Sequence, residues 1–143
     1  MAIAPPIVRH AESLMRDIEE AVLRFPKRHQ HVAGQQLRTH IFRVAQLANQ
    51  AWSKPTQRTV LVERLDEAVA DFRLMMQLAS GLRAFASFGQ FEDLSRKLSE
   101  LGREVGGWKR QLHPKGQNDR ARAPSQSAVT LSTASASTYE AKP

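Results

Sequence analysis

Apolar residues recur every three or four positions along most of the chain, the spacing that places side chains on one face of an α-helix. The first run begins just after Pro5 and Pro6, residues that are tolerated at a helix start, and it stops near Pro26. It predicts one amphipathic helix with an inward face of Ile7, Ala11, Leu14, Ile18, Ala21 and Phe25.

The second and third runs have the same spacing. The second ends before Pro55, because the residue that precedes a proline disfavours the helical conformation. Its apolar face carries Leu37, Ile41, Val44, Ala48 and Ala51. The third run follows a heptad-like repeat. It predicts an inward seam of Leu61, Leu65, Ala68, Phe72, Met75, Ala79 and Leu82.

The fourth run begins at a helix-capping signal. Ser87 and Gln90 have the spacing of a capping box, in which two side chains satisfy free backbone N–H groups at a helix start. The run continues through Phe91, Leu94, Leu98, Leu101, Val105, Trp108 and Leu112. No alternating stretch indicates a strand. Short connections favour antiparallel neighbours, so residues 1–112 are predicted to form an all-α, antiparallel up-down four-helix bundle.

Residues 113–143 have a different composition. The segment "HPKGQNDRARAPSQSAVTLSTASASTYEAKP" is rich in Ser, Ala, Thr and Pro. It has too few large apolar side chains to offset the entropy lost on ordering it. We predict a disordered, basic C-terminal tail.

Length and composition limit the remaining possibilities. The chain has 143 residues, of which 41% are hydrophobic, enough for the core of one domain. It has no cysteine, which excludes disulfides, thiolate metal sites and thiol nucleophiles. The first residues lack the apolar run of a signal peptide, and no segment approaches the about 20 apolar residues of a membrane span. We expect a soluble, cytoplasmic protein with no membrane partner.

Positive charge is concentrated in one part of the chain. The formal net charge is +7. Between Ala21 and Val62 there is no acidic residue, whereas elsewhere the acids lie near Arg in exposed pairs of little energetic consequence. The acid-free stretch holds seven basic residues: Arg24, Lys27, Arg28, Arg38, Arg43, Lys54 and Arg58. Clustered cations without neutralising acids favour a phosphate-bearing partner, and the alternative is a surface that only keeps the protein soluble.

The second helix contributes a polar face to this stretch. Opposite its apolar face lie Thr39, Arg43, Gln46 and Gln50. No aromatic side chain is interleaved with them, so we expect recognition of backbone and shape more than of bases. The predicted nucleic-acid-binding residues are Arg24, Lys27, Arg28, His29, His31, Arg38, Arg43, Lys54, Arg58, Lys109 and Arg110.

Two further patterns indicate contacts between subunits. Leu74 and Leu78 lie away from the inward seam of the third helix, at the angle that Phe85 shares if the helical phase continues, and a second apolar stripe suggests an interface. Alternatively, they close the end of a small monomeric core. The fourth helix has a ridge of small residues despite the helix-weakening effect of glycine, which suggests that another backbone approaches closely. The predicted interface comprises Leu74, Leu78, Phe85, Gly102, Gly106 and Trp108.

Few residues suggest chemistry. His29, His31 and His40 have no acid or cysteine nearby to complete a metal site, so we expect them to contact phosphate or solvent. The chain has no glycine-rich phosphate loop and no serine in a nucleophile elbow. We therefore expect no enzyme, no metal and no cofactor.

Two motifs carry a resemblance to a known family. "FPKRHQHVAG" from Phe25 to Gly34 and "FGQFEDLSRKLSELGREVGGWKR" from Phe88 to Arg110 resemble motifs of the accessory variability determinant proteins of diversity-generating retroelements, a four-helix-bundle family. The matched positions are Pro26, Lys27, Arg28 and His29 at the turn and Gly102, Arg103, Gly106, Gly107 and Trp108 on the last helix.

This resemblance implies a basic bundle that assembles as a pentameric barrel. Such a protein binds the element's reverse transcriptase and its template RNA and cDNA, supports mutagenic copying of a variable region, and has no catalytic activity of its own. Related bundles are encoded within ribosomal RNA intervening sequences, so an RNA-associated bundle of that type is an alternative. A helical adaptor that binds only proteins is another.

Overall fold

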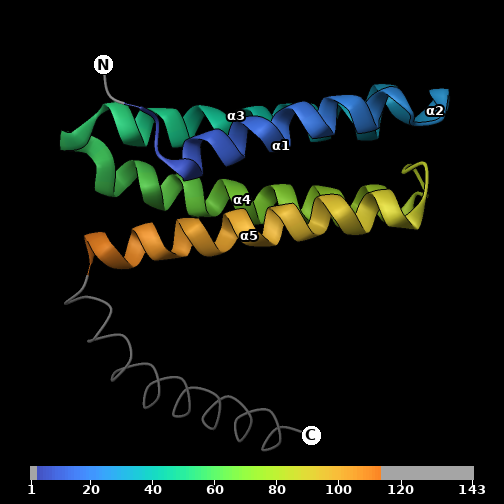
Figure 1. The fold of residues 1–143 in the computed structure, drawn as a ribbon. Coiled ribbons are helices and arrows are strands. Elements are labelled where there is room, and N and C mark those ends of the chain that lie inside the picture. The colour runs from blue at the N-terminus through green and yellow to red at the C-terminus, as the bar shows by residue number, and fades with distance from the viewer. Residues whose placement is uncertain (1–2, 114–143) are drawn as a thin grey trace, which may run out of the picture. The chain divides into compact units, whose positions relative to one another are not determined.

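The computed structural model describes residues 3–113, and the chain is helical through most of this part. Its long helices are α1 (Pro6–Leu23), α3 (Gln35–Ser53), α4 (Arg58–Gly81) and α5 (Phe88–Leu112), as Figure 1 shows. A short helix α2 (Lys27–His29) and a π-helical turn η1 (Gln30–Gly34) connect α1 to α3, and the 3₁₀ turn η2 (Pro55–Gln57) connects α3 to α4. The described residues contain no strand. The predicted tail lies, from residue 114 on, outside the described residues.

The long helices form an antiparallel up-down bundle, as predicted (Figure 1). Up to Lys109 they belong to one compact unit, in which α3 packs against both α1 and α4. Helix α5 completes the bundle, because Lys97 Nζ lies 2.8 Å from Asp17 Oδ2 of α1 and Lys109 Nζ lies 3.1 Å from Asp66 Oδ2 of α4. The hydrogen bond from Lys97 to the Asp17 carboxylate raises the pKa of Lys97.

Apolar side chains from all four long helices meet in one core. The largest fully buried ones include Ile18, Leu37, Ile41, Leu65, Phe72, Met76, Leu98 and Leu101. Each such burial contributes about 1.5 to 3 kcal/mol relative to an exposed side chain. No polar or charged side chain is buried among residues 3–113. None of the helices in this part of the chain is long and apolar enough to cross a membrane.

The predicted seam of α4 is wrong at two positions. Met76 is buried at 1% exposure, whereas Met75 is only half-buried and Leu82, the residue after the helix, is 50% exposed. An α-helix has 3.6 residues per turn, so a strict seven-residue repeat turns away from the core by about 20° in each heptad. Along the positions Leu61, Ala68, Met75 and Leu82 the repeat has therefore left the core face by the third heptad, whereas Ala79 stays buried.

The connection from α1 to α3 depends on a close backbone approach. Gly34 is buried, and a Cβ atom there would lie 2.6 Å from Val22 Cγ1. Any larger residue would push the start of α3 away from α1. Phe25, which follows α1, enters the core at 3% exposure. Buried contacts therefore fix the connection near its start, at Phe25, and at its end, at Gly34.

The connection from α4 to α5 is closed by backbone and capping bonds. The N–H groups of Arg83 and Ala84 donate to Ser80 O and Ala79 O at 2.9 and 3.0 Å, and Arg83 has a φ of 60°. The predicted capping box is confirmed in part, since Gln90 N donates to Ser87 Oγ at 3.1 Å. The Gln90 side chain accepts from Ala86 N at 3.0 Å, one residue earlier than the motif predicts.

Candidate nucleic-acid interface

The side chain of Gln30 stabilises the basic turn between α1 and α3, residues 24–34, by hydrogen bonds to the backbone. Gln30 Nε2 donates to Phe25 O at 3.0 Å and to Leu23 O at 3.3 Å, which satisfies carbonyl groups left free where α1 ends. With Phe25 buried, the short helix α2 points Lys27 and Arg28 into solvent. The turn therefore presents its charges from a fixed backbone.

The histidines near this turn have separate environments. His29 is half-buried, and its Nε2 atom is enclosed without a hydrogen-bond partner, so the ring is not a freely accessible surface group. His31 is exposed. His40 Nδ1 lies 2.8 Å from Gln36 O of its own helix. No group of three His, Asp or Glu side chains within residues 3–113 is arranged to hold a metal ion.

Three of the predicted binding residues already have partners in the chain. Arg38 forms a bidentate salt bridge with Glu19, with distances of 3.0 Å for Nε–Oε1 and 2.8 Å for Nη2–Oε2. The expectation that the acid-free stretch lacks neutralisation is thus wrong for Arg38, because α1 supplies the acid from across the helix pair. Arg58 donates to Ala51 O and Trp52 O, both at 2.8 Å, at the end of α3. Lys109 pairs with Asp66.

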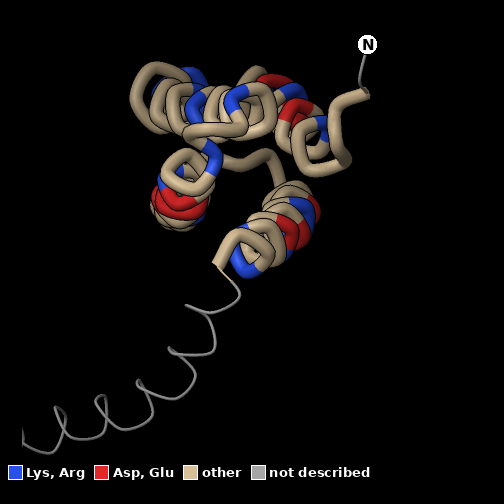
Figure 2. Tube along the Cα trace, turned by 90° about the vertical axis from the view of Figure 1, so that its left-hand side faces the viewer, with Lys and Arg blue, Asp and Glu red and all other residues tan. Residues whose placement is uncertain are grey.

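The other predicted cations are exposed, and within the described residues their side chains have no ion pair or hydrogen bond. The structure does not gather them into one site. Arg24, Lys27 and Arg28 lie at one end of the bundle, whereas Lys54 lies at the other end, between α3 and α4. Arg43 lies midway along α3, and Arg110 is exposed in the last turn of α5. Viewed from the Lys54 end, the tube in Figure 2 shows acids and bases intermixed along most helices.

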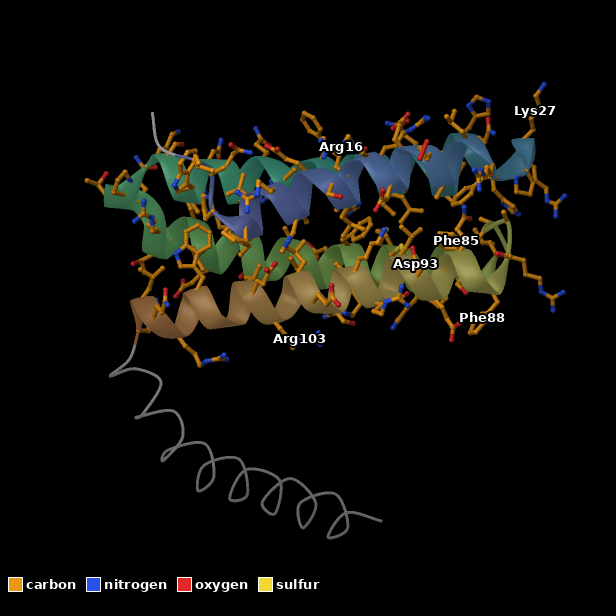
Figure 3. The ribbon with its side chains drawn as sticks, viewed as in Figure 1. Arg16, Lys27, Phe85, Phe88, Asp93 and Arg103 are labelled. Carbon is orange, nitrogen blue, oxygen red and sulfur yellow. The ribbon has the colours of Figure 1, made fainter. Side chains whose placement is uncertain are left out.

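A second connection adds to the α2 end. Phe25 from the basic turn and Phe85 from the α4–α5 connection meet edge to face, with ring centroids 5.1 Å apart. This contact brings both connections to one end of the bundle, where Figure 3 shows Lys27, Phe85 and Phe88. Arg83 belongs to this connection, and its exposed side chain has no partner in the described residues. We call Arg24, Lys27, Arg28 and Arg83 the bundle-end cations.

Arg83 and the aromatic contact were not predicted from the sequence. A signal was present, because residues 72–91 form a second stretch without Asp or Glu. Phe85 was assigned to the outer stripe of the third helix on the assumption that the helical phase continues. Helix α4 ends at Gly81, so Phe85 instead turns toward Phe25.

The second apolar stripe on α4 is exposed, as expected. Leu74 and Leu78 are 50% and 55% exposed, and Leu82 follows at the same spacing. We call these three residues the leucine stripe. Gly102 instead faces α4 within the bundle, because a Cβ there would lie 3.0 Å from Arg73 Nη2. Gly106 and Trp108 are half-buried, and whether any of these predicted residues contacts another subunit stays a prediction.

A shallow groove between α1 and α3 was not predicted. Its volume is about 540 Å³, and Phe42, 61% exposed, is the largest apolar side chain in it. The lining comprises Met15, Arg16, Glu19, Gln35, Arg38, Thr39, Ile41 and Phe42. We call it the α1–α3 groove. The bundle thus exposes apolar surface on two different sides, on α4 and between α1 and α3.

Comparison with known proteins assigns the chain to a family. No curated protein matches it. A family model described as bAvd-like matches residues 7–112, from the start of α1 to the end of α5, and includes the basic turn and the glycine-rich end of α5. This match confirms the resemblance based on the two motifs, and the chain belongs to the bAvd-like family.

Proposed function

We propose that the chain is a non-catalytic accessory protein of a diversity-generating retroelement. It acts in the cytoplasm, binds the element's reverse transcriptase together with template RNA and cDNA, and supports mutagenic reverse transcription. Membership of the bAvd-like family supports this assignment. The observation that carries the nucleic-acid part is the group of bundle-end cations, exposed and unpaired within residues 3–113.

Nucleic-acid binding is tested through its salt dependence. Each cation that contacts a phosphate releases counterions, so log K falls with log salt by about 0.7 to 0.9 per contact. Replacing both Lys27 and Arg28 with Gln should weaken RNA binding and flatten this slope. Arg64→Gln is the control for the single substitution Arg28→Gln, because each removes one positive charge from an exposed position, and Arg64 lies on α4 near Glu63 and Glu67. Equal effects of Arg28→Gln and Arg64→Gln would mean that only total charge matters.

The reverse transcriptase is the partner that distinguishes this proposal from other roles. Purified chain, mixed with the reverse transcriptase and template RNA of its element, should form a complex and be required for cDNA synthesis through the variable region. A chain that binds RNA but does not bind the reverse transcriptase would favour a bundle of the ribosomal intervening-sequence type. Binding of proteins with no salt-dependent RNA affinity would favour an adaptor.

The proposal includes assembly into a pentameric ring. A cyclic oligomer uses two different surfaces of each subunit, which meet head to tail around the ring. The leucine stripe and the α1–α3 groove are two such surfaces, one projecting and one recessed, on different helices. A ring would repeat the bundle-end cations and hold several weak phosphate contacts at high effective concentration.

A further inference from the structure

Phe88 is a large aromatic side chain in solvent at the positively charged end of the bundle. It is the first residue of α5 and is 69% exposed. It belongs to the same connection as Arg83, five positions earlier in the chain. Burial in the bundle core does not explain a phenylalanine at this position, because most of the ring lies outside the core.

The aromatic ring of Phe88 nevertheless packs against another aromatic side chain on its inner side. Phe88 packs against Phe91 with centroids 6.0 Å apart and an interplanar angle of 37°. Phe91 lies 5.4 Å from Phe85, which contacts the buried Phe25. The Ser87 cap fixes the backbone of this first turn. Phe88 is therefore the outer member of an aromatic row that begins in the core.

The charge around this row is positive. The bundle-end cations come from the two stretches without acids, residues 21–62 and 72–91. The acids that border these stretches on α1 and α5 are Glu20 and Glu92, both exposed. The next acid on α5, Asp93, is paired with Arg96 and Lys97. The cations at this end thus outnumber the acids nearest to them in sequence.

We propose that this end of the bundle binds a single-stranded segment of nucleic acid, with one base stacked on Phe88, a neighbouring phosphate held by Arg83, and phosphates further along the strand held by Lys27 and Arg28. Lys27 and Phe88 lie on opposite sides of the bundle end with Phe85 between them (Figure 3), so the strand crosses this end from α2 to α5. A base can stack on a side chain only when its face is free, which a continuous duplex does not offer. This inference rests on the proposed nucleic-acid binding and specifies the form that is bound.

The test compares two probes against the full chain. The probes are oligo(U) of about 12 nucleotides and an RNA duplex of the same length, each followed by fluorescence anisotropy. Phe88→Leu keeps an apolar side chain but removes the aromatic face. It should weaken oligo(U) binding by at least about 5-fold, leave duplex binding unchanged, and leave the salt slope unchanged because no charge is lost. Phe88→Trp should retain or increase oligo(U) affinity.

The control is Val60→Ala, since Val60 is also an exposed apolar residue but lies at the start of α4, at the opposite end of the bundle. It should leave oligo(U) binding unchanged. As a second readout, Arg83→Gln should weaken oligo(U) binding and flatten its salt slope, even if a Phe88 variant failed to fold.

Three results would overturn the inference: equal losses for Phe88→Leu and Val60→Ala, an equal loss on duplex RNA, or a changed oligomeric state for Phe88→Leu. The last would make Phe88 a subunit contact. Wild-type chain that binds neither probe would remove the proposed nucleic-acid binding as well, so the two failures are distinguishable.

Discussion

Arg83 has a backbone conformation that is costly for its residue type. Its φ of 60° lies in the left-handed region, which costs a residue with a Cβ roughly 1 to 2 kcal/mol and is usually occupied by glycine just after a helix. The nearby glycine, Gly81, is two residues too early to occupy this position. A long cation retained there despite the strain is consistent with a role in binding rather than in folding.

Arg83→Gly should therefore change stability and binding in opposite directions. Relief of the strained φ, offset in part by the greater freedom of glycine in the unfolded chain, should stabilise the fold by about 0.5 to 1 kcal/mol. Loss of the cation should weaken RNA binding and flatten the salt slope. Thermal unfolding and anisotropy measure the two effects. A variant that is less stable, or one that is more stable with unchanged binding, would contradict this role.

Arg38 and Arg28 look alike in sequence but differ in the structure. Arg38 is engaged by Glu19, whereas Arg28 has no side-chain partner within residues 3–113. Arg28→Gln should weaken RNA binding more than Arg38→Gln does. Glu19→Gln should strengthen binding, because it removes a negative charge and frees Arg38. That gain should vanish when Arg38 is also replaced, which a double-mutant cycle measures. Since the pair is exposed, its effect on stability should stay below about 1 kcal/mol.

At the scale of elements, the packing of α3 onto α1 depends on Gly34. A Cβ there would meet the buried Val22 side chain at 2.6 Å, and Val22 has little room to move. Gly34→Ala should destabilise the fold by about 1 to 3 kcal/mol, as overpacked cores do. Gly81→Ala is the matched control, because nothing lies within 4 Å of its added Cβ and alanine favours helix. Thermal unfolding should show a clear loss for Gly34→Ala and none for Gly81→Ala.

Sequence patterns predicted the elements well where the signal was local. Proline positions and the Ser87 cap located helix ends, and the apolar period predicted most of the core. The errors arose where a small angular difference adds up along a helix, or where the position of a helix end decides which way a side chain faces. Met75 was misplaced by the drift of a seven-residue repeat, and Phe85 by continuing a helix past its end.

The candidate site shows the same limit. The basic turn and the exposure of Leu74 and Leu78 were predictable from composition and spacing. The neutralisation of Arg38 by Glu19, and the meeting of Phe25 with Phe85, join residues that are distant in sequence. Only the antiparallel arrangement of the helices brings such residues together.

At the scale of the whole molecule, the two exposed apolar surfaces bear on how the proposed ring would be built. The leucine stripe projects from α4, whereas Phe42 lies in the α1–α3 groove. A two-fold interface would pair each surface with itself, but a ring pairs one surface with the other. If the stripe of one subunit enters the groove of the next, both surfaces are covered in every subunit.

Leu78→Glu and Phe42→Glu should each dissociate the proposed oligomer at micromolar concentration with helicity retained, because each would place an unpaired charge in an apolar contact outside the core. Light scattering and circular dichroism measure the two properties. Unfolding together with dissociation would mean that the altered residue supports the core.

Mixing the two variants distinguishes a ring contact from a two-fold contact. The Leu78→Glu chain keeps an intact groove, and the Phe42→Glu chain keeps an intact leucine stripe, so one competent interface can form between them. An equimolar mixture should yield heterodimers that grow no further, because the remaining free surfaces both carry the new charge. Two-fold interfaces would yield no mixed dimers, since each surface would need an intact copy of itself. Monomers in the mixture would show that the stripe and the groove are not partners, whereas heterodimers alone would establish the head-to-tail contact that closes a ring.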